Sequence, residues 1–229
     1  MTDPTHTARQ HEPSGARGRS SSPHSAPQPT ETERLSGVAA TSWSRGQLAG
    51  RLSEISSWGN SAPLTLAFTI VQEAQLAAEP AIWITRAREG QHDGTFFPPD
   101  AAASGIDLDA LPVVRVPDAA TAARAADKLL RSGAFGLVIL DIGADDRVPI
   151  PLQSRLLGLA GRHDAAVLFL TEKQSDKPSV GSLVSLRVQA TRRQTTEGRY
   201  VCDLEVMKDK RQGPGWSHSE IRSGPAGLR

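Results

Sequence analysis

Segments with the character of strands alternate with segments of helical character from residue 50 to residue 170, and this alternation constrains the fold more than any other feature. Strands are predicted at residues 51–56, 81–84, 113–116, 137–141 and 166–170. Helices are predicted between them, at residues 63–74, 118–130 and 152–162. Buried strands separated by helices are typical of a parallel sheet with helices on both faces.

Residues at the helix ends agree with these boundaries. Pro63 suits the first turn of a helix, because its missing N–H is one that no helical carbonyl needs. Asp118 is predicted as an N-cap, and Gly133 lies where a left-handed C-cap belongs. The helix between them is expected to bury one side, formed by Ala122, Ala125, Ala126, Leu129 and Leu130. The stretch of residues 86–107, rich in glycine and proline, is predicted to be irregular.

The pattern changes after residue 180. Apolar residues there alternate with polar ones, which predicts a half-exposed strand. The apolar positions are Val184, Leu186, Val188 and Ala190. Residues 197–198 predict a turn, and residues 200–208 predict a returning strand. The expected fold class is therefore α/β, with a mainly parallel sheet flanked by helices and a C-terminal antiparallel hairpin.

The first 35 residues differ from the rest in composition. They contain five prolines and a run of serines, and Leu35 is the first large aliphatic residue after Met1. Such a segment cannot bury enough apolar surface to offset the entropy of ordering it. We expect a disordered tail at residues 1–35 and a core domain at residues 36–229. The tail histidines, His6, His11 and His24, match no familiar metal-ligand spacing and are expected to be solvated.

Composition limits the classes of function. The 26 Lys and Arg residues nearly balance the 25 Asp and Glu residues, so no global basic field indicates a nucleic-acid partner. The single cysteine, Cys202, excludes an internal disulfide and a cysteine-based zinc cage, and it fits a reducing cytosol. No apolar run has the length of a membrane span. We expect a cytoplasmic protein that does not contact the membrane.

Several motifs resemble the bacterial recombinase RecA in their order and spacing. Residues 50–66 resemble its first strand, phosphate loop and following helix, and residues 106–111 resemble the approach to a later strand. Residues 131–141 are similar to its second nucleotide motif, and residues 206–210 to the paired lysines near the end of its core. The resemblance spans about residues 46–222 and implies a RecA-like core.

The phosphate loop departs from the RecA pattern. A working loop has the form G-x-x-x-x-G-K-[ST], in which glycines admit the phosphates, lysine neutralises charge and Ser/Thr holds Mg²⁺. The corresponding residues here are Ser57, Ala62, Pro63 and Leu64. Pro63 replaces the lysine and also removes an N–H from the anion-binding helix terminus. We expect a degenerate, non-catalytic site that holds no nucleotide, metal or other cofactor.

Two further positions concern catalysis. The resemblance places Ala87 where RecA has its general base, with Glu89 two residues later as an expected solvated loop carboxylate. Asp141 stands where RecA orients the water shell of the metal, and here it is expected to cap the following loop. A residual ATPase with an unorthodox loop is the third-ranked alternative.

The two mobile loops through which RecA contacts DNA correspond to residues 142–151 and 171–182, and both are short here. Lys173 and Lys177 are basic residues that phosphate could contact, so a weak DNA contact stays open. A single-stranded-DNA-binding accessory protein is accordingly the second-ranked function. It would need exposed aromatic residues for base stacking, whereas Trp83 lies within an apolar strand and is expected in the core.

Assembly is also expected to differ from that of RecA. The tail has no counterpart of the apolar helix that links RecA subunits, and the chain has no counterpart of its C-terminal domain, so we expect a monomer in isolation. In RecA, the lysines that correspond to Lys208 and Lys210 reach across a subunit interface to the ATP of a neighbour. We expect these lysines, with Arg211 and Trp216, to form an interface with an active RecA protomer.

Together these features resemble the ImuA family, RecA-derived accessory proteins of bacterial mutagenesis cassettes. The resemblance implies an adaptor that acts in translesion synthesis under DNA-damage (SOS) control, in the cytoplasm and at the nucleoid. Its implied partners are RecA and the Y-family-like polymerase relative of the cassette, which is ImuB-like. The cell-division inhibitor SulA shares the RecA-like origin and is a further alternative.

Overall fold

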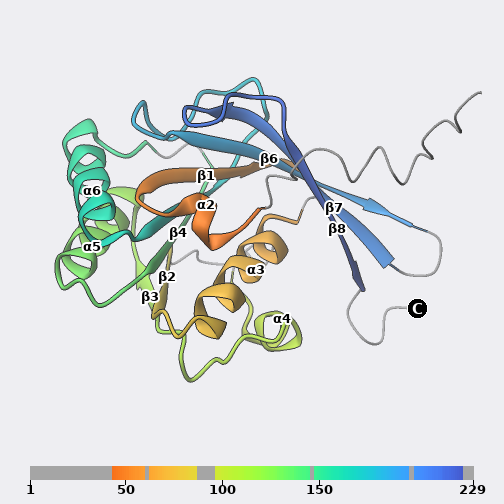
Figure 1. Ribbon diagram of the computed structural model, residues 1–229, viewed down its shortest axis with the longest axis horizontal. Coiled ribbons are helices and arrows are strands. Elements are labelled where there is room, and N and C mark those ends of the chain that lie inside the picture. Colours follow the sequence, from red (N-terminus) through yellow and green to blue (C-terminus); the bar gives the residue numbers. More distant parts are fainter. Residues whose placement is uncertain (1–42, 60–61, 87–95, 145–146, 196–198, 224–229) are drawn as a thin grey trace, which may run out of the picture. The chain divides into compact units, whose positions relative to one another are not determined.

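The computed structural model describes residues 43–59, 62–86, 96–144, 147–195 and 199–223 (Figure 1). The predicted tail, residues 1–35, lies outside them. The described helices are α2 (Arg45–Leu48), α3 (Pro63–Leu76), α4 (Pro98–Ala103), α5 (Ala119–Arg131) and α6 (Ile150–His163). The described strands are β1 (Arg51–Ser57), β2 (Ala81–Arg86), β3 (Val113–Val116), β4 (Leu137–Gly143), β5 (Ala166–Glu172), β6 (Leu186–Gln194), β7 (Arg199–Asp209) and β8 (Ser217–Ser223).

In the described part of the chain, eight strands form one sheet in the order β3-β2-β4-β5-β1-β6-β7-β8. Strand β1 lies between β5 and β6 and is parallel to both, and β2, β3 and β4 extend the parallel part. Strands β7 and β8 add to it in antiparallel fashion. The predicted α/β fold class is confirmed, and the arrangement is consistent with a RecA-like core.

Helices cover both faces of the parallel part (Figure 1). Helix α3 packs on one face, in an apolar cluster that includes Ile55 and Trp83. Helices α5 and α6 pack on the other face, in a second cluster that includes Leu52 and Val138. Leu52 and Ile55 lie on different faces because side chains alternate along a strand. The faces are called the α3 face and the α5/α6 face below.

The predicted helix ends are confirmed. Pro63 occupies the first turn of α3. The Asp118 carboxylate accepts a hydrogen bond of 2.7 Å from the backbone N–H of Thr121, and Gly133 has a left-handed φ of +68°. Trp83 is fully buried, as predicted, and its ring centroid lies 5.5 Å from that of Phe68.

The burial of α5 follows the prediction only in part. Ala122, Ala126 and Leu130 are buried, whereas Ala125 and Leu129 are partly exposed. Ala123 and Asp127 are buried in addition. The buried stripe is therefore rotated slightly from the predicted one, and the carboxylate of Asp127 within it forms a 2.7 Å ion pair with Arg155 of α6.

Two elements were not predicted. The irregular stretch of residues 86–107 contains helix α4, so the prediction is wrong there; Pro98 and Pro99 begin this helix, where proline costs no hydrogen bond. Strand β8 extends the predicted hairpin to three strands. Among the described helices, none combines the length and the apolar character needed to cross a membrane.

Candidate functional site at two edges of the sheet

The parallel strands divide the candidate residues between two edges of the sheet. The carboxyl ends of β1, β2, β4 and β5 form one edge, called the carboxyl edge, where ligands of open α/β sheets bind. Their amino ends form the opposite, amino edge. Strand β7 is antiparallel to β6, and Asp209 pairs with Leu186, which in turn pairs with Ser53 of β1. The end of β7 therefore lies toward the amino edge.

The degenerate phosphate loop lies at the carboxyl edge. Ser57 ends β1, and its carbonyl accepts a 2.7 Å hydrogen bond from the backbone N–H of Lys173. Ala62 is 4% exposed and gives α3 no side-chain cap. Pro63 and Leu64 are partly buried, and Leu64 packs against the apolar cluster of the α3 face. The terminus of α3 therefore presents apolar groups where a phosphate loop presents a lysine and a hydroxyl.

Asp141 also lies at the carboxyl edge, near the end of β4. It is buried, and its Oδ2 accepts a hydrogen bond of 3.2 Å from the hydroxyl of Thr85 on β2. This carboxylate therefore bonds to the neighbouring strand, and its role as a cap of the following loop stays a prediction. Ala87 and Glu89, the two positions considered for a general base, lie outside the described residues.

The β5–β6 segment, residues 173–185, is held by Glu54 of β1. Glu54 is fully buried and forms a 2.6 Å ion pair with Lys173. The same carboxylate accepts hydrogen bonds from the Thr171 hydroxyl at 2.7 Å and from the backbone N–H of Val180 at 3.0 Å. Lys173 is therefore buried and paired, so its predicted availability to phosphate is wrong. Lys177 is exposed, and its contact with DNA stays a prediction.

Arg187 of β6 also holds the β5–β6 segment in place. Its guanidinium donates to the Ser56 hydroxyl at 3.2 Å, to the carbonyl of Gln174 at 3.0 Å and to the carbonyl of Lys177. Arg187 and Gln189 are buried. The prediction of a half-exposed strand is wrong at these two positions, because the β5–β6 segment covers the face on which they lie.

Asp209 is a buried acidic residue at the amino edge, next to several basic residues. Its Oδ1 accepts 2.9 Å hydrogen bonds from Arg51 Nη1 and from the backbone N–H of Arg211, and its Oδ2 accepts one of 3.1 Å from the Trp216 indole. Burial disfavours the charge of Asp209, but the Arg211 N–H, the Trp216 indole and Arg51 together outweigh burial and lower its pKa. The buried carboxylate is thus ionised and fully engaged.

Of the predicted interface residues, Arg211 and Trp216 hydrogen-bond to this carboxylate, whereas Lys208 pairs with Arg187 of β6 and lies near the charge of Glu54. Lys210 and Arg211 are exposed, and Lys208 and Trp216 are partly exposed. Burial, followed by the neighbouring charge of Lys210, lowers the pKa of Lys208. The backbone N–H of Lys210 donates to the carbonyl of Ser185 at 2.8 Å. We call residues 208–211 the basic turn.

Sequence reasoning missed Asp209 and Arg51. Regular alternation along β7 would bury Lys208 with Leu204 and Val206 and expose Asp209. Instead, the register between β6 and β7 shifts between Arg187 and Val188, and Met207 is the extra residue. A β-bulge of this kind reverses the alternation that follows it. The sequence signal was the isolated acid between two lysines.

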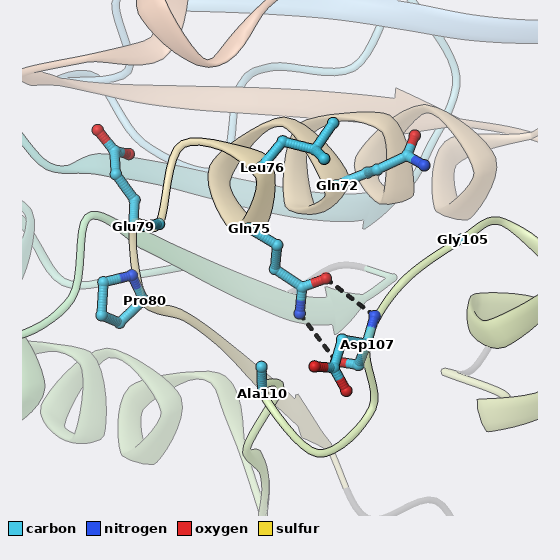
Figure 2. A pocket seen from close by; sticks show the side chains of 9 residues that line it. Gln72, Gln75, Leu76, Glu79, Pro80, Gly105, Asp107 and Ala110 are labelled. Atoms are coloured by element: carbon cyan, nitrogen blue, oxygen red, sulfur yellow. Dashed lines mark hydrogen bonds between the residues drawn. The ribbon is translucent and has the colours of Figure 1, made fainter.

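A cavity of about 480 Å³ lies farther along the amino edge, at the end of α3 (Figure 2). The side chain of Gln75 bridges both backbone groups of Asp107, donating to its carbonyl at 2.8 Å and accepting from its N–H at 3.0 Å. Glu79, which also lines the cavity, forms a 2.7 Å ion pair with Arg45. These polar groups of the lining are thus engaged with the protein itself.

Comparison with known proteins adds no relative. No protein-family model matches the chain, and no curated protein matches it either. Among the described residues, no three or more His, Cys, Asp or Glu side chains are grouped so that they could hold a metal ion. The geometry of the two edges is therefore the basis for a functional hypothesis.

Proposed function

We propose that this protein is a non-catalytic adaptor with a RecA-like core that binds an active RecA protomer through its basic turn. In this role it caps or interrupts a RecA filament and thereby modulates recombinase activity. The proposal extends to a cytoplasmic, nucleoid-associated role in SOS-induced translesion mutagenesis, beside an ImuB-like polymerase relative. This placement follows the resemblance to the ImuA family.

The observation that carries the proposal is the contrast between the two edges. At the carboxyl edge, Ala62 to Leu64 of the phosphate-loop position offer no charged or hydroxyl group, and Ser57, which has a hydroxyl, is buried. The amino edge presents Lys210 and Arg211 to solvent beside an engaged Asp209. A head-to-tail assembly joins two different surfaces of each subunit. A subunit with one functional surface of the two accepts a neighbour on one side only, as a cap does.

The experiment that tests the proposal is the affinity for nucleotide-bound RecA, measured with the wild type and with K208A/K210A. Loss of two charge-assisted hydrogen bonds, worth about 1.5–3 kcal/mol each, predicts a loss of affinity of about a hundredfold or more. The variant R115A/K128A removes the same charge from exposed sites on β3 and α5 and serves as the control.

RecA filament assembly is measured in parallel on single-stranded DNA with nucleotide. The wild type is expected to shorten filaments or slow their growth at substoichiometric amounts, and R115A/K128A is expected to do the same. Equal affinity of K208A/K210A and the wild type for RecA would remove the proposal.

A further inference from the structure

Three hydrogen bonds converge on the buried carboxylate of Asp209, which is part of the basic turn. Within the turn, Asp209 accepts the N–H of Arg211 at 2.9 Å, which closes the chain back on itself just after β7. From the next segment it accepts the indole N–H of Trp216 at 3.1 Å. From β1 it receives Arg51, whose side chain is 2% exposed. The basic turn is therefore connected to β1, a strand in the parallel part of the sheet.

Burial makes this connection rigid. The side chain of Asp209 has no exposed surface, and Trp216 packs against the apolar cluster of the α3 face. A buried ion pair that is also hydrogen-bonded fixes its members in one geometry, because any displacement leaves a charge unpaired in a poorly polarisable interior. The Cα positions of residues 209–211 are thus set from inside the sheet.

The charged ends of Lys210 and Arg211 are not held in this way. The Lys210 side chain is exposed, and its ammonium donates a long hydrogen bond of 3.4 Å to the carbonyl of Ser182. The Arg211 side chain lies beside Gly50, whose left-handed φ of +64° favours glycine. Their backbone is held while their charged ends remain available, which is the arrangement expected of preorganised binding groups.

From these contacts we infer that Asp209 is a positioning residue, which together with Arg51 and Trp216 presents Lys210 and Arg211 to an anionic group of the partner. This inference rests on the proposed function, since it concerns the same basic turn. It assigns a role to Arg51 and Asp209, which are buried, and to the indole N–H of Trp216.

The test uses variants that remove the connection without leaving a buried charge. R51M/D209L replaces both members of the ion pair by apolar residues of similar size, which is often neutral for stability. R51K keeps a cation beside Asp209 and is the conservative control. W216F removes the indole hydrogen bond alone, and it carries the test if R51M/D209L does not fold.

Two readouts are taken. Hydrogen exchange of residues 209–211 requires no partner and is expected to speed up about tenfold or more in R51M/D209L and less in W216F, since a lost hydrogen bond of about 1 kcal/mol changes an opening equilibrium severalfold. The affinity for nucleotide-bound RecA, and its dependence on salt, are expected to fall toward those of K208A/K210A while the melting temperature is retained. R51K is expected to stay near the wild type in both.

The outcomes separate this inference from the proposed function. Unchanged hydrogen exchange at the turn in the folded variants overturns the inference, whatever the partner is. Affinity that falls in K208A/K210A but is retained in R51M/D209L and W216F also overturns it, while the proposed function stands. If K208A/K210A itself binds RecA like the wild type, the proposed function fails.

Discussion

Strand β1 contributes two buried charges, one on each face of the sheet, and the two ion pairs have opposite effects on the surface. On the α5/α6 face the strand supplies the acid, Glu54, and the β5–β6 segment supplies the base, Lys173. On the α3 face the strand supplies the base, Arg51, and the turn after β7 supplies the acid, Asp209.

The comparison shows that the polarity of a buried ion pair decides what its loop displays. The first pair consumes a positive charge of the segment at the carboxyl edge, so Lys173 is withdrawn from any ligand. The second pair neutralises the negative charge of Asp209 in the turn at the amino edge, so Lys210 and Arg211 stay exposed without an acidic partner in the turn. Two interactions of the same kind thus hide positive charge at one edge and present it at the other.

The largest expected effect concerns the first pair. Replacing Glu54 by alanine leaves Lys173 buried without its partner, and breaking a buried pair in this way costs about 3–5 kcal/mol. The measurement is the free energy of unfolding in urea. E54M/K173M, which removes both charges, is the matched control and is expected to lose much less. If the single and the double variant are equally destabilised, packing rather than charge explains the effect.

The second prediction concerns the pH dependence of stability through Asp209. Its folded pKa lies below the ordinary value of 3.8. The contribution is therefore fully present above the unfolded pKa and is lost as the pH falls through the folded value. We expect the melting temperature of the wild type to decline below about pH 4 more steeply than that of R51M/D209L. Parallel curves for the two proteins would show that Asp209 carries no such linkage.

The smallest expected effect comes from an ion pair that is not buried. Arg193 of β6 pairs with Asp203 of β7 at 2.9 Å, and its side chain is 68% exposed. Because solvent screens this pair, R193A is expected to change the free energy of unfolding by less than about 1 kcal/mol. A loss as large as that of E54A would contradict the claim that burial distinguishes these pairs.

Much of the fold could be predicted because its signals are local. The apolar strands, the N-cap at Asp118 and the left-handed Gly133 each depend on residues within a few positions. Contacts distant in sequence could not be predicted in the same way. The burial of Arg187 depends on the β5–β6 segment that covers it, and alternation along a strand contains no information about what lies above that strand.

The candidate site shows the same division. The degenerate phosphate loop was predicted by comparison, position by position, with a known motif. Ala62 and Leu64 have apolar surroundings, and the absence of nucleotide binding stays a prediction. The role of Asp209 was not evident, because one extra residue in β7 turns it inward. A bulge is determined by the pairing of two strands, so the sequence of one strand alone does not reveal it.

The weak hydrogen bond between the Lys210 ammonium and the carbonyl of Ser182 has a consequence for selectivity. That bond uses one of the three N–H donors of the ammonium, so a neutral acceptor at the others only replaces a hydrogen bond to water and gains little. A phosphate or carboxylate oxygen forms a bond roughly twice as strong with an ammonium. The basic turn therefore favours anionic groups of a partner over uncharged surfaces.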